Sequence, residues 1–419
     1  MSTLALAWRS LGNRRGTALL TIAAIAVSVA LLLGVQKMRT AARESFANTV
    51  SGVDLIVGAR SGQLNLLLYS VFRVGDATAN VSWSSYQKIA HHPDVEWTIP
   101  ISLGDSHRGF RVLGTNNDYY AHYRHAGDRA LSFAAGRNFK DLYDVVLGAD
   151  VARELGYQLG SRVIVAHGLG DVSFTLHKDQ PFRVVGILAP TGTPVDRTVH
   201  VPLEAITAIH LDWQGGTRAI GAPRSETDIR SRDLTPDAIT AFMVGMRSKV
   251  MTFTMQRAIN EYRGEPLLAI LPGVALTQLW SLVGIADTAL MVIAAFVVLA
   301  GLLGMLTAIL TSLNERRREM AILRSVGARP RHVFTLLVAE AGILAASGVL
   351  AGIALCYGLL AAAAPLLERR YGLVLPLTGL EPRDLALLGA IVFAGVCMGS
   401  IPAWRAYRNT LSDGLTLRI

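Results

Sequence analysis

Long apolar runs divide the chain into membrane-crossing segments and one large mixed segment. Residues 17–36 carry no charged side chain, and apolar runs return at 277–313, 333–367 and 385–404. Because about 20 apolar residues in a helix cross the hydrocarbon core, this pattern predicts a membrane protein with four transmembrane helices (TM1–TM4). Residues 37–276 contain no such run. We therefore expect a large α+β extracytoplasmic domain inserted between helices 1 and 2.

The first 36 residues are predicted to anchor the chain. Residues 1–16 mix Leu4 and Trp8 with Arg9 and Arg14, which is typical of an amphipathic helix lying in the membrane interface, and residues 17–36 form TM1. A cleaved signal peptide is the alternative interpretation, since basic residues precede an apolar run. The run is longer than the apolar part of most signal peptides and lacks a clear small-residue cleavage site, which favours an uncleaved anchor.

The inserted segment 37–276 alternates between strand and helix patterns. Runs rich in β-branched residues predict strands at 53–59, 145–149, 161–167, 182–189 and 198–203. Helical spacing of apolar residues predicts helices at 84–91, 150–155 and 248–262. Residues 213–237 are rich in glycine and mixed charges, so we expect a mobile surface loop there.

The second half of the chain is predicted to cross the membrane three times. Residues 277–313 form a stalk and TM2, 333–367 form TM3, 368–384 a short external loop, 385–404 TM4, and 405–419 a tail. Basic residues flank the apolar runs on one side, and the positive-inside rule places both termini in the cytoplasm. Glu340 lies within TM3; its carboxylate either faces a partner or water, or reaches the nearby interface.

Residues 314–332 connect TM2 to TM3 and combine arginines with an ordered apolar face. Met320, Ile322, Leu323 and Val326 fall near helical spacing, which predicts a short amphipathic helix at the cytoplasmic surface. A simpler interpretation is that the arginines only orient the spans and bind anionic lipid. That interpretation does not account for the acidic residues and the apolar face within the same segment.

Composition narrows the possible functions. The chain is 51% hydrophobic with a net charge of +9, and much of the basic excess lies beside the apolar runs. We therefore attribute the charge to membrane orientation and expect no nucleic-acid partner. Cys356 and Cys397 lie within apolar runs, so we expect them to pack in helices rather than form a disulfide framework.

Sequence motifs supply no catalytic site but leave two structural questions. No glycine is followed directly by lysine, so the phosphate-binding G-x-x-x-x-G-K-[ST] loop is absent, as are G-x-S-x-G and H-E-x-x-H. The pairs His91 with His92 and His122 with His125 are weak metal-ligand candidates, and we predict no metal site. Two pairs, Gly348 with Gly352 and Gly395 with Gly399, have the small-xxx-small spacing that allows close helix packing.

Several stretches resemble the permeases of MacB-type and FtsX-type ABC transporters. The segment NERRREMAILRSVGA is similar to the loop between the second and third membrane helices of that family. DVVLGADVARELGYQLGSRVIV (144–165), FRVVGILAPTGTPVDRTVHVPL (182–203) and residues 51–59 resemble parts of the MacB-like periplasmic core domain. The ending IPAWRAYRNTLSDGL resembles the family's closing motif.

The resemblance implies a mechanical function for the membrane helices. In the family the loop docks into an ATPase subunit, so the resemblance implies that the coupling residues are Glu315, Arg316, Glu319, Arg324, Gly327 and Ala328. No cofactor is expected in this chain, because ATP and Mg²⁺ would bind a partner ATPase. The chain is therefore expected to be a non-enzymatic permease subunit in the cell inner membrane.

The expected partners follow from the same resemblance. They are two copies of an ABC ATPase, a second copy of this chain, membrane lipids, and either a periplasmic adaptor with an outer-membrane channel or a periplasmic substrate-binding protein. Three alternatives stay open: an FtsX-like subunit that signals to a cell-wall hydrolase, a lipoprotein-releasing permease, and a membrane-anchored metal binder. The sequence does not identify a substrate.

Overall fold

The computed structural model describes residues 14–167, 180–211, 213–214, 217–218, 225–315, 329–371 and 379–408. The contacts divide the chain into two units. One unit comprises residues 1–41, 284–366 and 375–419, and the other comprises 42–283 and 367–374. Each unit has its own hydrophobic clusters, so each has a core of its own.

Short strands and helices alternate in the middle of the chain, and long helices lie towards both ends. In chain order the elements are α2 (Arg15–Asn48), β1 (Leu55–Ala59), α3 (Gln63–Leu67), the π-helix η1 (Leu68–Phe72), β2 (Val81–Ser82), α4 (Trp83–Ala90), β3 (Val95–His107), β4 (Phe110–Thr115), α5 (Asp118–His122), β5 (Arg124–His125), β6 (Arg129–Ala130), β7 (Phe133–Gly136), β8 (Asp144–Leu147), α6 (Ala149–Leu155), β9 (Arg162–Val163), β10 (Ala166–His167), β11 (Phe182–Leu188), η2 (Pro194–Arg197), β12 (Thr198–Pro202), α7 (Leu203–His210), β13 (Trp213–Gln214), β14 (Thr217–Arg218), α8 (Glu226–Arg230), β15 (Ala238–Ile239), β16 (Ala241–Met246), η3 (Lys249–Met251), α9 (Thr252–Asn260), β17 (Leu267–Ile270), α10 (Pro272–Glu315), α12 (Pro330–Tyr371) and α13 (Pro382–Arg408).

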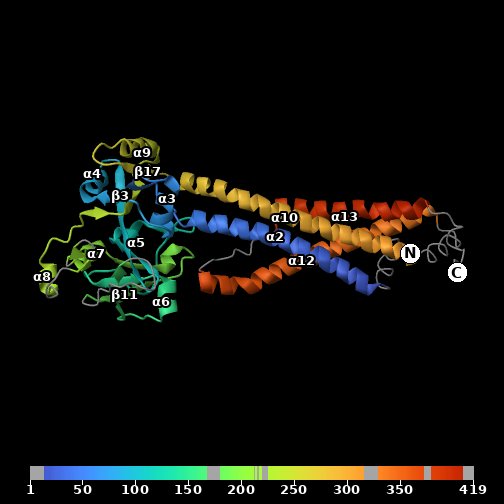
Figure 1. The fold of residues 1–419 in the computed structure, drawn as a ribbon, viewed down its shortest axis with the longest axis horizontal. Helices are drawn as coiled ribbons and strands as arrows, with labels where there is room; N and C mark the ends of the chain where they lie inside the picture. The colour runs from blue at the N-terminus through green and yellow to red at the C-terminus, as the bar shows by residue number, and fades with distance from the viewer. Residues whose placement is uncertain are drawn as a thin grey trace. The chain divides into compact units, whose positions relative to one another are not determined.

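A mixed sheet organises the large α+β unit. Its strand order is β17-β1-β16-β3-β4-β12-β8-β11-β7, with β10 beside β3 and β9 beside β11. Figure 1 labels its strands β3, β11 and β17. The long strand β3 serves both halves, because residues 95–101 pair with β16 and residues 102–107 pair with β4. The pairs β4–β12 and β8–β11 are parallel. Thr115 and Pro202 are register partners at the carboxyl ends of β4 and β12, so these two parallel strands end next to each other.

Both faces of this sheet are covered. In β1, Leu55 and Val57 belong to one buried cluster, whereas Ile56 between them belongs to another. Successive side chains of a strand point to opposite faces, so a strand buried on both faces needs a continuous apolar run. This accounts for the sequence LIVGA in β1, in which every residue is buried.

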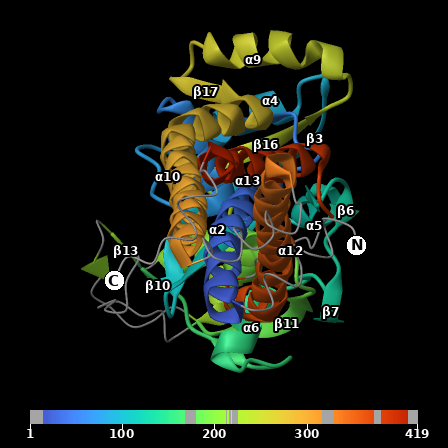
Figure 2. The same ribbon diagram turned by 90° about the vertical axis from the view of Figure 1, so that its right-hand side faces the viewer.

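The unit that comprises residues 1–41, 284–366 and 375–419, called the helix unit below, is built from four long helices. Within the described residues, four segments are long and apolar enough to cross a membrane: Arg15–Ala41, Thr288–Leu313, Arg331–Leu366 and Pro382–Arg408. They belong to α2, α10, α12 and α13, which Figure 2 shows nearly end-on. The predicted fold class, four long apolar helices with an α+β domain between the first and the second, is therefore confirmed.

Several local predictions differ from the structure. The predicted strand 161–167 is wrong, because β9 pairs with β11 while β10 pairs with β3, and the chain changes neighbour between them. Residues 226–230 of the predicted loop 213–237 form α8, whose first turn is capped by the Ser225 hydroxyl accepting from Asp228 N at 3.2 Å. The predicted helix 248–262 is shorter, with α9 at Thr252–Asn260.

The bounds of the long helices also differ from the predicted segments. Residues 15–16 begin α2, and residues 1–13 of the predicted interfacial helix lie outside the described residues. The helix α12 runs on to Tyr371 and α13 begins at Pro382, so the connection between these two helices is shorter than the predicted segment 368–384. Proline at the first helical position is favourable because no backbone N–H partner is needed there. Pro330 and Pro382 both start their helices in this way.

Candidate functional site in the membrane helices

Helices α2 and α12 approach closely at two glycines. A Cβ atom built on Gly348 would lie 2.6 Å from Cγ2 of Ile25, and one built on Gly352 would lie 2.6 Å from Cβ of Val29. The absence of a side chain is therefore required at both positions. Gly352 lies four residues after Gly348, and its contact Val29 lies four residues after Ile25. The two helices therefore run parallel.

Helices α12 and α13 also meet at two glycines. A Cβ atom on Gly395 would lie 2.6 Å from Cβ of Ala345, and one on Gly399 would lie 2.2 Å from Cβ of Ala341. From the first contact to the second, the residue number rises by four on α13 (395 to 399) and falls by four on α12 (345 to 341). These two helices are therefore antiparallel. The sequence analysis singled out all four of these glycines from their spacing, and the structure places each one at a helix contact.

A hydroxyl joins α2 to α10. Ser28 donates a hydrogen bond within its own helix to the Ala24 carbonyl at 2.8 Å and lies 3.1 Å from the Val297 carbonyl. A Cβ atom on Gly301 would lie 3.0 Å from the same hydroxyl oxygen. Ser28 is buried at 4% exposure. Its polar contact across the helices resembles the small-residue and hydroxyl packing that holds membrane helices together.

A charged cluster is buried between α2 and α13. The Lys37 ammonium lies 3.1 Å from Oδ2 of Asp384, and the Gln36 side-chain amide donates to Oδ1 at 2.7 Å. Lys37 and Asp384 are only 8% and 1% exposed. Lys37 also donates to the Gly379 carbonyl at 2.9 Å, and Asp384 accepts from Glu381 N at 3.0 Å. Asp384 therefore caps the first turn of α13 and also contacts Lys37 and Gln36 of α2.

The sequence analysis missed this cluster. The signal was present, because Lys37 follows directly on the uncharged run 17–36 and Asp384 directly precedes the run 385–404. Ionisable residues at the ends of membrane spans are common and usually reach water, so neither position suggested a buried pair. Only the tertiary structure brings these two residues, from opposite ends of the chain, into contact.

Glu340 is buried within the helix unit. It is 5% exposed and precedes Ala341, which meets Gly399 on α13. Of the two interpretations that the sequence left open, a side chain facing the neighbouring helices fits this burial better than one reaching the lipid interface.

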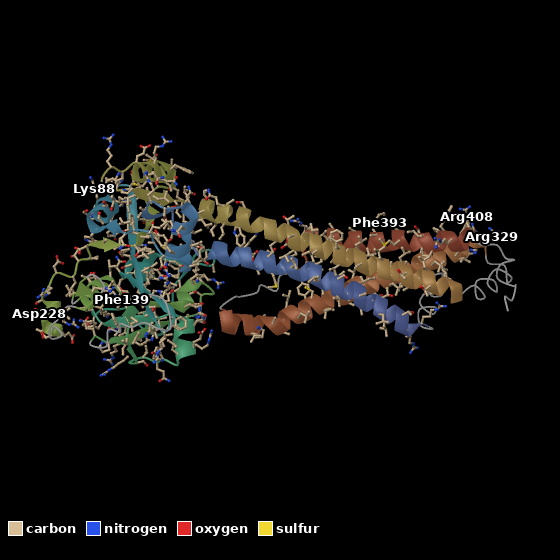
Figure 3. The ribbon with its side chains drawn as sticks, viewed as in Figure 1. Lys88, Phe139, Asp228, Arg329, Phe393 and Arg408 are labelled. Carbon is tan, nitrogen blue, oxygen red and sulfur yellow. The ribbon has the colours of Figure 1, made fainter. Side chains whose placement is uncertain are left out.

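The predicted coupling segment falls mostly beyond the described part of the chain. Glu315 is the last residue of α10, whereas Arg316, Glu319, Arg324, Gly327 and Ala328 lie outside the described residues. Arg329 and Arg408 are described, and Figure 3 shows them at the same end of the helix unit. The start of α12 and the end of α13 therefore share one end of that unit.

The histidines have separate environments in the large unit. His91 lies 2.7 Å from the Gln87 carbonyl, His92 lies 3.7 Å from Asp94, and the His122 ring stacks on Trp97 with centroids 5.0 Å apart. His125 is buried at 8% exposure. Among the described residues no group of three or more His, Cys, Asp or Glu has a metal-binding arrangement.

His200, which the sequence analysis did not single out, has an unusual environment. His200 on β12 is fully buried, and its Nδ1 donates to the Val146 carbonyl at 3.3 Å. Burial lowers the pKa of His200 to about 3, and the charge of Arg73 contributes to the same shift. The side chain therefore stays neutral in the folded domain. Its ring lies 5.2 Å from that of Tyr119, which makes it part of an aromatic core rather than a ligand set.

The fold and the helix contacts define a multi-pass membrane protein with a large α+β domain between its first two spans. Comparison with protein families matches residues 18–262 to the MacB-like periplasmic core domain and residues 291–411 to the FtsX-like permease C-terminal domain. The chain belongs to this MacB-like family of permeases. The match covers both units, so the resemblance inferred from the sequence is confirmed.

The curated relatives are longer and distant. The macrolide export ATP-binding/permease protein MacB of Bdellovibrio bacteriovorus is 24% identical over 81% of this chain and 51% of its own length. The pyoverdine export ATP-binding/permease protein PvdT of Pseudomonas syringae pv. tomato is 27% identical over 75% and 45%. The chain thus spans about half the length of these relatives. The periplasmic region of MacB from Actinobacillus actinomycetemcomitans matches 55% of this chain and 94% of its own, at 12% identity and a TM-score of 0.34.

Proposed function

We propose that this chain is the permease subunit of an ABC transporter and that a separate ATPase drives it. The observation that carries the proposal is that both family matches on this chain are permease domains. The relatives named above combine an ATP-binding part with a permease part, whereas this sequence contains no phosphate-binding G-x-x-x-x-G-K-[ST] loop. Two copies of the chain would then work with two ATPases.

The proposed mechanism is transmission of movement through packed helices. The contacts of Gly348 and Gly352 with α2, and of Gly395 and Gly399 with α12, leave no space for a side chain between the helices. Closely packed elements move as rigid bodies or switch between discrete arrangements, because their contacts do not deform continuously. A displacement applied to the segment 314–332 would accordingly move α10 and α12 together with their neighbours.

The proposed orientation follows from the basic residues. Arg329 and Arg408 lie at one end of the helix unit (Figure 3), and Arg331 and Arg405 adjoin them in the sequence. An excess of arginine marks the cytoplasmic side of membrane helices. We place this end and both termini in the cytoplasm, with the large domain on the opposite side. Because the relatives are named for export, we propose export rather than uptake.

The proposal is tested by ATP turnover of the reconstituted complex. The chain is copurified with its ATPase in lipid nanodiscs, and Glu319→Lys and Gly327→Val are compared with the unchanged chain. We expect both variants to insert and fold but to lose stimulated turnover, because charge reversal and a β-branched side chain alter the docking segment. Glu261→Lys is the matched control, since Glu261 is exposed on the large domain. Equal turnover in all variants would refute docking through this segment.

A second comparison separates transport from signalling. Transported substrate should stimulate turnover in the intact chain and should fail to stimulate it when residues 42–283 are deleted. Stimulation by a cell-wall hydrolase, with no response to any exported compound, would instead support the FtsX-like alternative.

A further inference from the structure

One exposed face of α13 changes from apolar to aromatic to cationic towards the end of the helix. Phe393, Cys397 and Ile401 are exposed at intervals of four residues, and the exposed residues Trp404 and Arg408 continue the same face. Tryptophan and tyrosine prefer the level of the lipid headgroups, and arginine reaches beyond it into water. The order of side chains along this face is therefore the order in which a lipid bilayer changes from hydrocarbon to headgroup.

The length of α13 places the aromatic and cationic residues at matching depths. Residue 395 is the midpoint of the candidate span Pro382–Arg408. At a rise of about 1.5 Å per residue, Trp404 lies about 14 Å and Arg408 about 20 Å along the axis from this midpoint. Half of the hydrocarbon core is about 15 Å thick. With the midpoint at the centre of the bilayer, Trp404 reaches the edge of the hydrocarbon and Arg408 reaches the headgroups.

Two aromatic rings at this level form one flat surface. The rings of Trp404 and Tyr407 stack with centroids 5.9 Å apart and an angle of 17° between their planes. The two side chains are 57% and 44% exposed, whereas Ala403 and Ala406 beside them are buried in a cluster with α12. The alanines thus fix this part of the helix, and the paired rings remain open to the surroundings.

The start of α12 lies at the same level as the end of α13. The contacts of Gly395 with Ala345 and of Gly399 with Ala341 set an antiparallel register, which places residue 408 opposite residue 332 when it is continued. A buried cluster supports this continuation, since it joins the two helix ends through Val333, Leu337, Ala403 and Ala406. Figure 3 shows Arg329 and Arg408 at one end of the helix unit. Two arginines of α12 and its approach, at 329 and 331, therefore share a level with two of α13, at 405 and 408.

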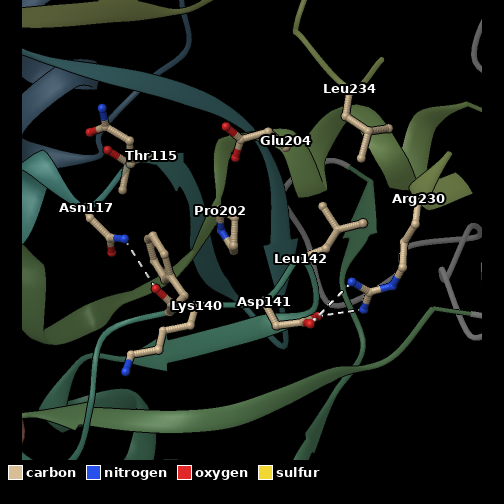
Figure 4. A pocket seen from close by; sticks show the side chains of 11 residues that line it. Thr115, Asn117, Lys140, Asp141, Leu142, Pro202, Glu204, Arg230 and Leu234 are labelled. Atoms are coloured by element: carbon tan, nitrogen blue, oxygen red, sulfur yellow. Dashed lines mark hydrogen bonds and ion pairs between the residues drawn. The ribbon is translucent and has the colours of Figure 1, made fainter. Parts of the chain in front are cut away.

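These four arginines differ from arginines of the large domain in having no acidic partner. All four are exposed, and within the described residues none of their guanidinium groups forms a hydrogen bond or ion pair. In the large domain, by contrast, Arg230 donates to both carboxylate oxygens of Asp141 at 2.7 and 3.3 Å (Figure 4), and Arg197 donates to Glu154 at 2.6 Å. The donors at the end of the helix unit are thus available to an outside anion.

A phosphate group suits these donors. The planar fork of a guanidinium group matches two oxygens of a phosphate, and such charge-assisted hydrogen bonds are stronger than neutral ones. A free phosphate ion would leave the exposed rings of Trp404 and Tyr407 without a function. A second copy of this surface would bring arginines against arginines. Phosphate attached to an apolar body, as in a phospholipid, uses both the cations and the rings.

We propose that the start of α12 and the end of α13 bind an anionic phospholipid, with its headgroup phosphate at Arg331, Arg405 and Arg408 and its glycerol and upper acyl chains against Trp404 and Tyr407. The proposal does not depend on an ATPase. Binding is measured without ATPase or nucleotide, so a failure here is distinguishable from a failure of the proposed transport function.

The test is native mass spectrometry of the full chain in detergent with two lipid probes. Phosphatidylglycerol and phosphatidylethanolamine with identical palmitoyl and oleoyl chains are titrated, and the lipid-bound fractions give the dissociation constants. We expect phosphatidylglycerol to bind about tenfold more tightly or better. Inorganic phosphate should displace it no more than sodium chloride does at equal ionic strength, because the acyl chains and rings contribute to binding.

Matched variants locate the site. Changing Arg405→Gln and Arg408→Gln together should weaken phosphatidylglycerol binding about tenfold or more, since each arginine near an anionic headgroup contributes roughly fivefold. Arg383→Gln is the control, because Arg383 is an exposed arginine in the first turn of the same helix, and it should leave binding unchanged. Trp404→Leu should weaken binding, whereas Phe393→Leu, on the same exposed face, should not.

A second pair of changes protects the test against a folding defect. Changing Arg329→Gln and Arg331→Gln together removes cations from the other helix and should also weaken phosphatidylglycerol, while Arg405→Lys with Arg408→Lys should keep more of the binding than the glutamine pair. Equal affinity for the two lipids, or an equal loss with Arg383→Gln, would overturn the proposal. Unchanged lipid binding in both glutamine pairs would also overturn it and would indicate that these arginines contact a protein partner. Displacement by inorganic phosphate beyond that by chloride would show a site for phosphate alone and not for lipid.

Discussion

The buried cluster of Lys37, Gln36 and Asp384 leads to a quantitative prediction about the membrane helices. Asp384→Asn removes the charge that Lys37 contacts at 3.1 Å, while both residues are at most 8% exposed. Lys37 would keep the Gly379 carbonyl as an acceptor at 2.9 Å, but a neutral amide would replace the charged carboxylate beside it. Removing one partner of a buried ion pair leaves an uncompensated charge and costs about 3–5 kcal/mol. We expect a loss of this size in the free energy of unfolding.

A double-mutant cycle isolates the interaction from other effects. Lys37→Met leaves Asp384 with hydrogen bonds from Gln36 and Glu381 N, and we expect a loss of the same order. The double variant Lys37→Met with Asp384→Asn contains no buried charge at this site. Pairs in direct contact couple by about 0.5–3 kcal/mol, so the double variant should be destabilised by less than the sum of the two single variants.

The assay is equilibrium unfolding in mixed micelles with increasing dodecyl sulfate. Glu381→Gln is the matched control, because Glu381 is exposed and its backbone, not its side chain, contacts Asp384. It should change stability by less than about 0.5 kcal/mol. Strictly additive losses in the cycle, or a loss for Glu381→Gln equal to that for Asp384→Asn, would show that no buried pair joins α2 to α13.

Two further predictions concern packing and pH. Gly399→Leu should destabilise the helix unit by roughly 1–3 kcal/mol through overpacking, because a Cβ atom there would lie 2.2 Å from Cβ of Ala341. The control is Gly389→Ala on the same helix, where nothing lies within 4 Å, and it should be neutral or slightly stabilising. The same micelle titration compares the two variants. His200 has a folded pKa of about 3, so between about pH 3 and 6.5 its side chain is protonated in the unfolded chain but not in the folded domain. The contribution of His200 to stability therefore falls by about 1.4 kcal/mol per pH unit as the pH decreases. Urea unfolding of the full chain at pH 7 and pH 5 should show this loss, and His200→Gln should reduce it; an unchanged pH dependence would contradict the assignment of a neutral buried imidazole.

Some strands were predictable and others were not, for a reason visible in their residues. The runs that became β1, β11 and β12 are short, β-branched and bounded by glycine, proline or aspartate. The long strand β3 contains Pro100 and Gly104, which normally interrupt strands. Pro100 nevertheless pairs with Phe242 of β16, and its carbonyl accepts from the Thr115 hydroxyl at 2.7 Å. Gly104 lies where the register to β4 shifts. The strand therefore exists because its neighbours pair with it.

Local patterns in the amino-acid sequence were sufficient to predict the number of membrane helices, the position of the inserted domain and the family. These patterns are uncharged runs long enough to cross a bilayer, arginines beside them, and contiguous motifs. The glycine spacing also identified four positions that the structure places at helix contacts. Such features are readable because each depends on residues that are neighbours in the chain.

The meeting of distant polar groups depends instead on the folded chain. Lys37 contacts Asp384, and Arg230 contacts Asp141. A charge at the end of an apolar run has the same local sequence whether it reaches water or a buried partner. Burial and partner are properties of the packed fold, because they depend on which helices and strands become neighbours.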